Sequence, residues 1–246
     1  MRDQDSRRRG RQIRVFAAML LASLLSSAAA EPHLTDAELA KERAALLAAM
    51  AQANAPVKVS GERIKLPTAA VLGAEEAPVV LVEFGDYQCG FCRRHLLTVM
   101  PSLLRDHVET GQLRYVFIEF PAERNLPASL AASNAALCAD DQGRYLEMRE
   151  RIYTHPMNVD ADGFLRHAER LELDLERFTD CVEAGTHEPL IRRHLALGQR
   201  MRVRGTPTFF VGRPGPDDGA LRFERRITGA QPLDLFQREI TTLLVE

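Results

Sequence analysis

The sequence contains no tryptophan and only four cysteines among 246 residues. Without tryptophan, intrinsic tryptophan fluorescence cannot report a redox change. Only one C-x-x-C pair is present, Cys89 with Cys92. A zinc site needs a second pair of ligands, whereas Cys138 and Cys181 lie far apart in the chain. A c-type haem needs histidine after the second cysteine, and that position is Arg93.

The sequence also has no basic surplus beyond its first 30 positions. Residues 1–30 hold 6 of the 32 Lys and Arg residues and 2 of the 34 Asp and Glu residues. The remaining 26 basic and 32 acidic residues leave residues 31–246 with a net charge of −6. Phosphate binding requires a basic surface, so this balance argues against nucleic acid as a partner.

The first 30 residues have the pattern of a secretory signal peptide. Arginines precede the apolar run VFAAMLLASLL, and small residues SSAAA follow it. Ala28 and Ala30 fit the A-x-A rule, which predicts cleavage after Ala30 and export to the periplasm. The alternative is an uncleaved membrane anchor, although the uncharged run 15–30 is short for a full span. In an oxidising compartment, an even number of cysteines suggests disulfides.

Residues 31–59 are expected to form an N-terminal helical extension. Thr35 and Glu38 form a capping box, Ala and Leu fill the interior, and Asn54 with Pro56 marks the end. This helix either docks on the rest of the chain or associates with copies of itself.

The remaining sequence predicts an α/β fold. Residues 79–84 are a β-branched run typical of a strand that is buried on both faces. A helix over 91–109, bent at Pro101, and a second strand over 113–120 complete a crossover with parallel strands. A third strand over 206–212 and a fourth over 221–229 read as a hairpin, and a helix closes the chain.

Residues 122–201 are helical in character, with interruptions near Gly143, Pro156, Gly163 and Gly185. Without this helical block, the order of elements is that of a thioredoxin-like core.

Three interpretations of Cys89 and Cys92 are open. With His95 they would supply an incomplete ligand set for a soft ion such as copper. A purely structural disulfide is also possible. The third is a redox pair, which the position explains: Cys89 lies at or just before the first turn of a helix. There the free backbone N–H groups and the helix dipole favour a thiolate and lower its pKa below about 8.5. Cys92, one turn later, is expected to be more buried.

The motifs VEFGDYQCGFC and RGTPTFFVG together resemble the DsbA-like branch of the thioredoxin superfamily. The resemblance covers about residues 60–246 and implies a thioredoxin-like fold with a helical insertion at about 122–186. It implies that Cys89 is the attacking cysteine and Cys92 its resolving partner. It also implies that Pro207 is a cis-proline facing them, which leaves the Thr206 backbone free to pair with an extended substrate. The alternative is an ordinary proline at the start of a strand.

The resemblance places Glu83, six positions before Cys89, beneath the second cysteine. A carboxyl buried there has a raised pKa and can shuttle a proton for Cys92. Alternatively, Glu83 points to water or pairs with an arginine.

The sequence departs from the archetypal DsbA between the cysteines, where Gly90 and Phe91 replace Pro-His. Phenylalanine cannot stabilise a thiolate as histidine does, so a milder oxidant is expected. His95 or Arg93 would compensate from the helix, unless both are surface residues.

Cys138 and Cys181 both fall in the helical block. The resemblance implies a non-catalytic disulfide that staples the insertion to itself, worth about 4 kcal/mol in the chain-entropy model. The alternative is two separate buried thiols.

The leading hypothesis is an exported thiol–disulfide oxidoreductase that uses no cofactor. It would oxidise cysteine-containing secreted proteins and be reoxidised by a membrane redox partner, either quinone-linked or a reductase. The first alternative is a disulfide isomerase or reductase of the same fold that oligomerises through its N-terminal helix. The second is a copper-binding or substrate-holding protein.

Overall fold

The computed structural model describes residues 35–53, 55–59, 63–67, 70–156, 159–215 and 219–245. The predicted signal peptide and its cleavage site after Ala30 lie outside these residues. The described chain divides into two units, one ending at Ala51 and the other running from Gln52 to the C-terminus.

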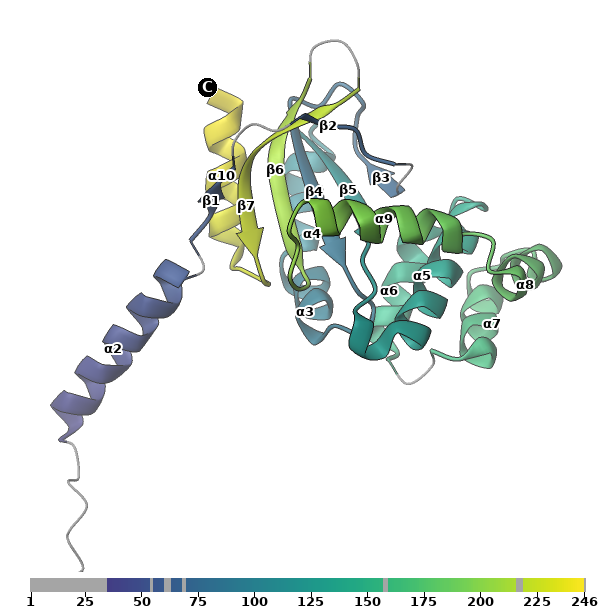
Figure 1. Ribbon diagram of the computed structural model, residues 1–246, viewed down its shortest axis with the longest axis horizontal. Coiled ribbons are helices and arrows are strands. Elements are labelled where there is room, and N and C mark those ends of the chain that lie inside the picture. The colour runs from purple at the N-terminus through teal and green to yellow at the C-terminus, as the bar shows by residue number, and fades with distance from the viewer. Residues whose placement is uncertain are drawn as a thin grey trace, which may run out of the picture. The chain divides into compact units, whose positions relative to one another are not determined.

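Four strands form the centre of the sheet in the second unit (Figure 1). These are β4 (Val79–Gly85), β5 (Leu113–Glu119), β6 (Thr208–Pro214) and β7 (Leu221–Thr228). β4 pairs with β5 in parallel and with β6 antiparallel, and β6 pairs antiparallel with β7. Every residue of β4 is buried. The predicted parallel crossover, hairpin and doubly buried strand are confirmed.

Three short strands extend the sheet, and none was expected from the sequence. β1 (Val57–Lys58) and β2 (Arg63–Ile64) pair antiparallel with β7, and β3 (Ala70–Leu72) pairs antiparallel with β5. Segments of two or three residues are too short to show an alternating pattern. The sheet therefore begins at residue 57, within the segment that the sequence assigned to the helical extension.

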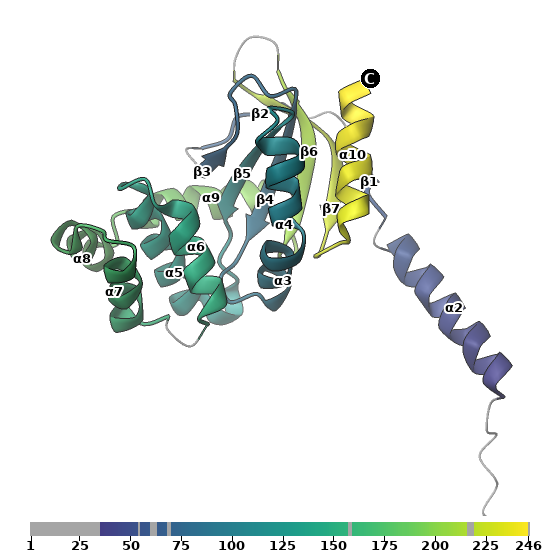
Figure 2. The same cartoon turned by 180° about the vertical axis from the view of Figure 1, so that it is seen from behind.

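Helices cover both faces of the sheet, as Figures 1 and 2 show from opposite sides. One face packs against α4 (Met100–Leu103) and α10 (Leu233–Val245), and the other against α9 (Glu188–Arg200). The helix expected over 91–109 is interrupted: α3 (Gly90–Thr98) ends, α4 begins at Met100, and a π-helical turn follows over 104–108. Pro101 falls in the first turn of α4, where its missing N–H removes no helical hydrogen bond.

The helical block inserted after β5 consists of α5 (Leu126–Asp140), α6 (Tyr145–Thr154), α7 (Ala161–Arg170) and α8 (Leu175–Ala184), followed by α9. Gly163 does not interrupt a helix. It lies in the first turn of α7, where its N–H donates to the Asp160 carboxylate at 2.7 Å. That carboxylate satisfies one of the free N–H groups at the helix start, so α7 begins at a regular cap.

Among the described residues, the first unit consists of α2 (Asp36–Ala53), whose last two residues belong to the second unit. Its start is the predicted capping box: the Glu38 N–H donates to the Thr35 hydroxyl, and the Thr35 N–H donates to the Glu38 carboxylate at 2.8 Å. Among the described residues, no helix combines the length and apolar character needed to cross a membrane. Whether α2 docks or self-associates stays a prediction.

Candidate active site

The turn between β4 and α3 positions Cys89 at the helix start. Asp86 organises this turn: its backbone carbonyl accepts from the Cys89 N–H at 3.0 Å. Its carboxylate accepts from the N–H groups of Gln88, at 3.0 Å, and Ala122, at 3.2 Å. Cys89 is the N-cap of α3, with extended backbone angles, and Cys92 follows one turn later. This is the local arrangement that the sequence predicts.

The two thiols are free and both are buried, but their environments differ. The pKa of Cys89 is lowered to about 5, chiefly by a hydrogen bond from the Cys92 thiol. Burial opposes this shift, and the Thr206 side chain and the N–H groups of Cys92 and Phe91 reinforce it. The pKa of Cys92 is raised, first by burial and then by its hydrogen bond to Cys89 and the charge of Glu83. The pair thus combines one thiol that favours the thiolate form with one that favours the protonated form.

The loop before β6 meets this pair from the other end of the sequence. The peptide bond between Thr206 and Pro207 is cis. The Cys89 thiol donates to the Thr206 carbonyl oxygen at 3.2 Å across 117 positions of sequence. Pro207 is buried, whereas Thr206 is partly exposed. Residues far apart in the chain therefore form one site.

Gly90 and Phe91 lie on the solvent side of the site. Apart from its chain neighbours and the backbone of its own helix, no atom comes within 4 Å of the position that a Gly90 side chain would occupy. Phe91 is 59% exposed, and the Arg94 guanidinium lies 5.1 Å from the centre of its ring. A groove of about 640 Å³ opens beside Cys89, lined by Phe91, Phe120, Pro121, Leu195, Val203, Arg204 and Thr206, among others. An apolar surface beside a nucleophilic thiol can hold an extended peptide.

The sequence offered two alternatives for Glu83, a buried carboxyl or one that points to water or pairs with an arginine. Glu83 is fully buried and is also paired with an arginine. Its carboxylate lies 2.8 Å from Nη2 of Arg149 and accepts a hydrogen bond from the Tyr115 hydroxyl. Burial raises the pKa of Glu83, and Arg149 and Tyr115 oppose the rise. Its charge contributes to the raised pKa of Cys92. Glu83 is therefore electrostatically coupled to the cysteine pair.

Arg149 is the partner that the sequence analysis missed. It belongs to α6, in the helical block, and is fully buried. Its guanidinium lies 3.8 Å from the centre of the Phe117 ring, and Nη1 is 2.9 Å from Sδ of Met100. The sequence carries a signal for it, because Tyr145 and Tyr153 lie one helical turn before and after Arg149 on the apolar face of α6.

A second buried carboxyl, Glu119, was also missed. It accepts hydrogen bonds from the hydroxyls of Tyr145 at 2.8 Å, Ser133 at 2.7 Å and Tyr87 at 3.3 Å. Burial raises its pKa to about 8, against the lowering effect of these donors. The network ties the end of β5 to the turn before Cys89 and to α5 and α6. Three donors around one carboxyl are a tertiary arrangement, so the linear sequence gives no sign of it.

The sequence allowed His95 to be a surface residue, and the structure shows that it is not. It is fully buried, and its Nε2 lies 3.2 Å from the Tyr115 hydroxyl. Burial, and then the charge of Arg149, lowers its pKa to about 3, so the ring is neutral and cannot compensate for the missing histidine between the cysteines. Arg93, by contrast, is exposed.

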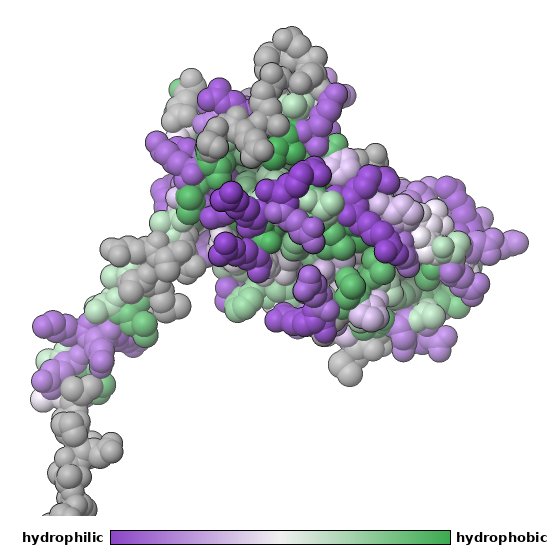
Figure 3. Space-filling view, in the orientation of Figure 1, coloured by the Kyte–Doolittle hydropathy of each residue, from purple (hydrophilic) through white to green (hydrophobic). Residues whose placement is uncertain are grey.

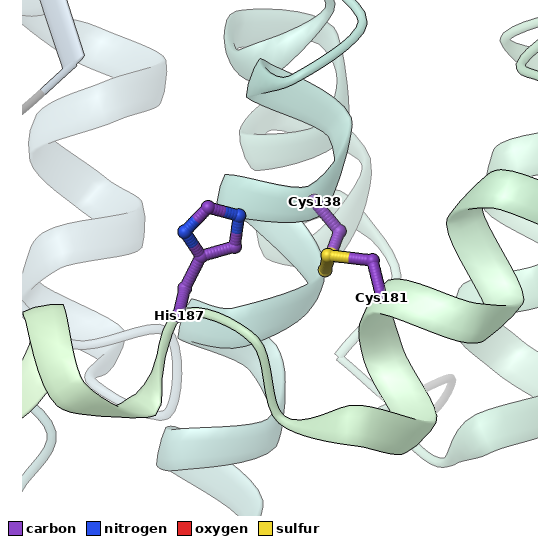
Figure 4. A group of neighbouring side chains, drawn as sticks. All are labelled: Cys138, Cys181 and His187. Atoms are coloured by element: carbon purple, nitrogen blue, oxygen red, sulfur yellow. A yellow bond between two sulfur atoms is a disulfide. The ribbon is translucent and has the colours of Figure 1, made fainter.

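A disulfide joins Cys138 of α5 to Cys181 of α8 and cross-links the helical block internally (Figure 4). His187 lies beside it, with Nε2 at 2.9 Å from the Asp141 carboxylate. Cys138, Cys181 and His187 form the one group of three such side chains in the described part of the chain whose potential metal-binding atoms all lie within 4.8 Å of one another. Cys89, Cys92 and His95 do not belong to this group. A bonded disulfide offers no thiolate, so this set does not fit a metal ion.

The acidity of Cys89 predicts how its reactivity depends on pH. We expect alkylation of reduced Cys89 by iodoacetamide to accelerate as pH rises through about 5 and to level off above that value, because only the thiolate reacts. Cys92, with its raised pKa, should stay unmodified over the same range. Rates between pH 3.5 and 8, with the modified residue identified by mass spectrometry, test this. A midpoint near 8.5, the ordinary value for a free thiol, contradicts it.

Comparison with known proteins places the chain in a family. A thioredoxin family model matches residues 65–215. The Na(+)/H(+) antiporter NhaA 1 of Mycobacterium sp. (strain KMS) is 35% identical over 155 residues, which are 61% of this chain and 25% of that protein, so the chain spans about a quarter of the length of this relative. The probable disulfide bond formation protein D of Bacillus anthracis is 28% identical over 148 residues, which are 57% of this chain and 68% of that protein.

Among solved structures, alpha-DsbA1 of Wolbachia pipientis superimposes with a TM-score of 0.63 at 20% identity. The match covers 73% of this chain and 92% of that one. The fold expected from the sequence, a thioredoxin-like core with a helical insertion, is confirmed. The chain therefore belongs to the thioredoxin family, and its fold is that of the DsbA-like proteins.

Proposed function

We propose that this protein is an exported thiol–disulfide oxidoreductase that forms disulfides in cysteine-containing secreted proteins. The observation that carries the proposal is the contrast between the two thiols. Cys89 has a pKa of about 5 and faces the cis Thr206–Pro207 loop, whereas Cys92 is buried with a raised pKa. The relatives named as a disulfide bond formation protein and as DsbA support the same activity.

The oxidised protein reacts in two steps. A substrate thiolate attacks Sγ of Cys89, which forms the mixed disulfide and breaks the bond to Cys92. A second substrate thiolate then attacks the substrate sulfur of the mixed disulfide, and Cys89 leaves as a thiolate. The substrate gains one disulfide, and the protein keeps the two electrons as a dithiol. A leaving thiol of low pKa departs fast and stabilises the reduced protein, which makes the disulfide oxidising.

Glu83 takes part in the proton balance of the first step. When Cys92 leaves as a thiolate, it does so in a buried site beside the negative charge of Glu83, where a thiolate is disfavoured. Cys92 therefore takes up a proton. Glu83, whose own pKa is raised by burial, can relay that proton: its carboxylate takes a proton from solvent and passes it to Cys92, and the path runs in reverse when Cys92 is reoxidised.

The partners follow from this cycle. Substrates are reduced proteins that reach the periplasm, and the dithiol is reoxidised by a membrane redox partner. The backbone of Thr206, next to the Cys89 thiol, pairs with an extended substrate by strand addition.

One observation favours a second candidate, a disulfide isomerase or reductase. Most of α2 belongs to a unit separate from the sheet, and its apolar residues Leu39 and Leu46 are exposed, so they are open to contact with a second copy. An isomerase of this design is an oligomer and is kept as a dithiol by a membrane reductant.

The redox state of Cys89 and Cys92 in cells separates the oxidase from the isomerase, and the reduction potential separates the oxidase from a thioredoxin-like reductase. We expect the Cys89–Cys92 couple, equilibrated with glutathione, to have a potential less negative than about −200 mV, because stabilisation of the Cys89 thiolate favours the reduced protein. Oxidised protein mixed with a reduced, unfolded two-thiol substrate should transfer its disulfide completely. A thioredoxin-like potential near about −270 mV, or a cysteine pair found mostly reduced in cells by alkylation gel shift, contradicts the oxidase.

A further inference from the structure

The segment between α9 and β6 alternates basic and apolar residues. Arg200, Arg202 and Arg204 are exposed, whereas Met201 and Val203 between them are buried against the sheet. Arg202 has a left-handed backbone, with a φ of 55°. Arg202 follows the C-cap of α9, and the N–H groups of Arg202 and Val203 donate to the carbonyls of Gln199 and Gly198, so this conformation ends the helix. The segment thus presents three guanidinium groups in a row on the protein surface.

This segment joins two hollows. At one end, Arg204 lines the groove beside Cys89, together with Arg124. At the other end, Arg200 and Arg202 line a second hollow of about 540 Å³, together with Lys58, Arg226 and the apolar residues Ile64, Met201, Phe210 and Phe223. Figure 3 shows strongly hydrophilic side chains gathered where the C-terminal end of α9 meets the edge of the sheet. The surface leading away from the nucleophilic thiol is therefore lined by cations.

The charges along this surface are unbalanced. Six cations line the two hollows, and Glu123 is the one acidic residue among the described residues that line them. Within the described part of the chain, none of the six forms an ion pair with a carboxylate, and Nε of Arg226 is buried without a hydrogen-bond partner. This positive surface belongs to a chain whose residues 31–246 carry a net charge of −6. A local field opposite to the overall charge selects negatively charged partners at the place where it acts.

We infer that this surface binds an acidic segment of the substrate polypeptide while the substrate cysteine reacts at Cys89. This specifies the substrate class of the proposed function and rests on it: cysteine-containing proteins with Asp and Glu close to the reacting cysteine. The apolar residues in both hollows receive the neighbouring side chains, and the arginines bind the carboxylates. Arginine suits this role because its planar fork binds a carboxylate through two hydrogen bonds.

The test compares two synthetic peptides that each contain two cysteines and differ only in three flanking residues, either glutamate or lysine. Oxidised protein is mixed with each peptide in stopped flow at low salt. We expect the glutamate peptide to react at least about 10-fold faster than the lysine peptide, and the difference to shrink in 0.5 M salt. Reaction of each peptide with a small neutral disulfide gives its intrinsic thiol reactivity. Glutamates raise the pKa of a nearby thiol, so intrinsic reactivity favours the lysine peptide, opposite to the expected result.

Charge-reversed variants locate the effect. In the double variant Arg200→Glu/Arg202→Glu, the preference for the glutamate peptide should fall at least about 5-fold, with each rate divided by the same protein's rate for dithiothreitol. The matched control is Arg166→Glu/Arg170→Glu, which makes the same change at exposed positions on α7. The control should keep the preference of the original protein.

Each outcome has one meaning. Equal rates for the two peptides, with dithiothreitol oxidised normally, overturn the inference and leave the proposed function standing. An equal loss of preference in both double variants also overturns it, because overall charge is then the cause. Binding to vesicles of anionic lipid without a peptide preference assigns the surface to a membrane and overturns it too. If neither dithiothreitol nor either peptide is oxidised, the proposed function itself is wrong.

Discussion

Replacing Cys89 with alanine is expected to abolish disulfide transfer to a reduced, unfolded substrate. Cys89 is the thiol of the pair whose pKa is lowered, to about 5, and it contacts the Thr206 carbonyl at the edge of the groove. Cys89→Ala leaves Cys92 as a single thiol, so the variant has no Cys89–Cys92 disulfide to transfer, and Cys92 is fully buried with a raised pKa. Loss of free thiols from the substrate, followed by alkylation and mass spectrometry, should show no transfer above background.

Two further variants make this result specific. Cys92→Ala, mixed with a substrate that already contains a disulfide, should accumulate a mixed disulfide. The Cys89 thiolate attacks the substrate disulfide and releases one substrate thiolate, and Cys92 is no longer there to attack Cys89 and release the substrate. The control is Cys138→Ala/Cys181→Ala, which removes both cysteines of the disulfide in the helical block and leaves Cys89 and Cys92 in place. The control should still transfer its disulfide. If Cys89→Ala retains full activity, Cys89 is not the residue that exchanges with the substrate.

The parts of the site that the sequence predicted are those set by neighbouring residues. Cys89 starts a helix because a buried strand and a turn precede it, and the spacing of the pair puts Cys92 one turn further on. The crossover from β4 to β5 follows from two apolar runs with a helix between them. Local periodicity and turn residues determine such features, so one sequence is enough to find them.

The parts that the sequence missed depend on contacts between distant segments. Arg149 lies 66 positions from Glu83, and Ser133 and Tyr145 meet Glu119 from two different helices. Nothing in the local sequence states which carboxyl a buried arginine will meet. The helical block is thus more than an addition to the thioredoxin-like core, because α6 supplies the cation that pairs with Glu83, whose charge acts on the cysteine pair.

Arg149 is therefore the residue outside the cysteine motif whose loss should matter most. Replacement by methionine keeps the length and the apolar stem but removes the charge, which leaves the Glu83 carboxylate buried without its counter-ion. Breaking a buried pair in this way typically costs about 3–5 kcal/mol. We expect a fall of about 4 kcal/mol in the free energy of unfolding, measured by urea denaturation of the oxidised protein at pH 7. Arg193→Met, at an exposed position on α9, is the control and should change stability by less than about 0.5 kcal/mol.

The dependence of this loss on pH identifies its cause. Arg149 opposes the rise in the pKa of Glu83, so the pKa of Glu83 should rise further in Arg149→Met. An acid whose pKa is higher in the folded state than in the unfolded state binds more protons when folded, so its stability falls as pH rises between the two values. The deficit of Arg149→Met relative to the original protein should therefore be smaller at pH 5 than at pH 7.

Adding Glu83→Gln to Arg149→Met should recover part of the lost stability, because the buried charge is then gone. Two results together would contradict this account: a stability deficit that is the same at pH 5 and pH 7, and a double variant whose loss equals the sum of the losses of Arg149→Met and Glu83→Gln alone. Arg149 would then act through packing against Phe117 and Met100 instead of through its charge.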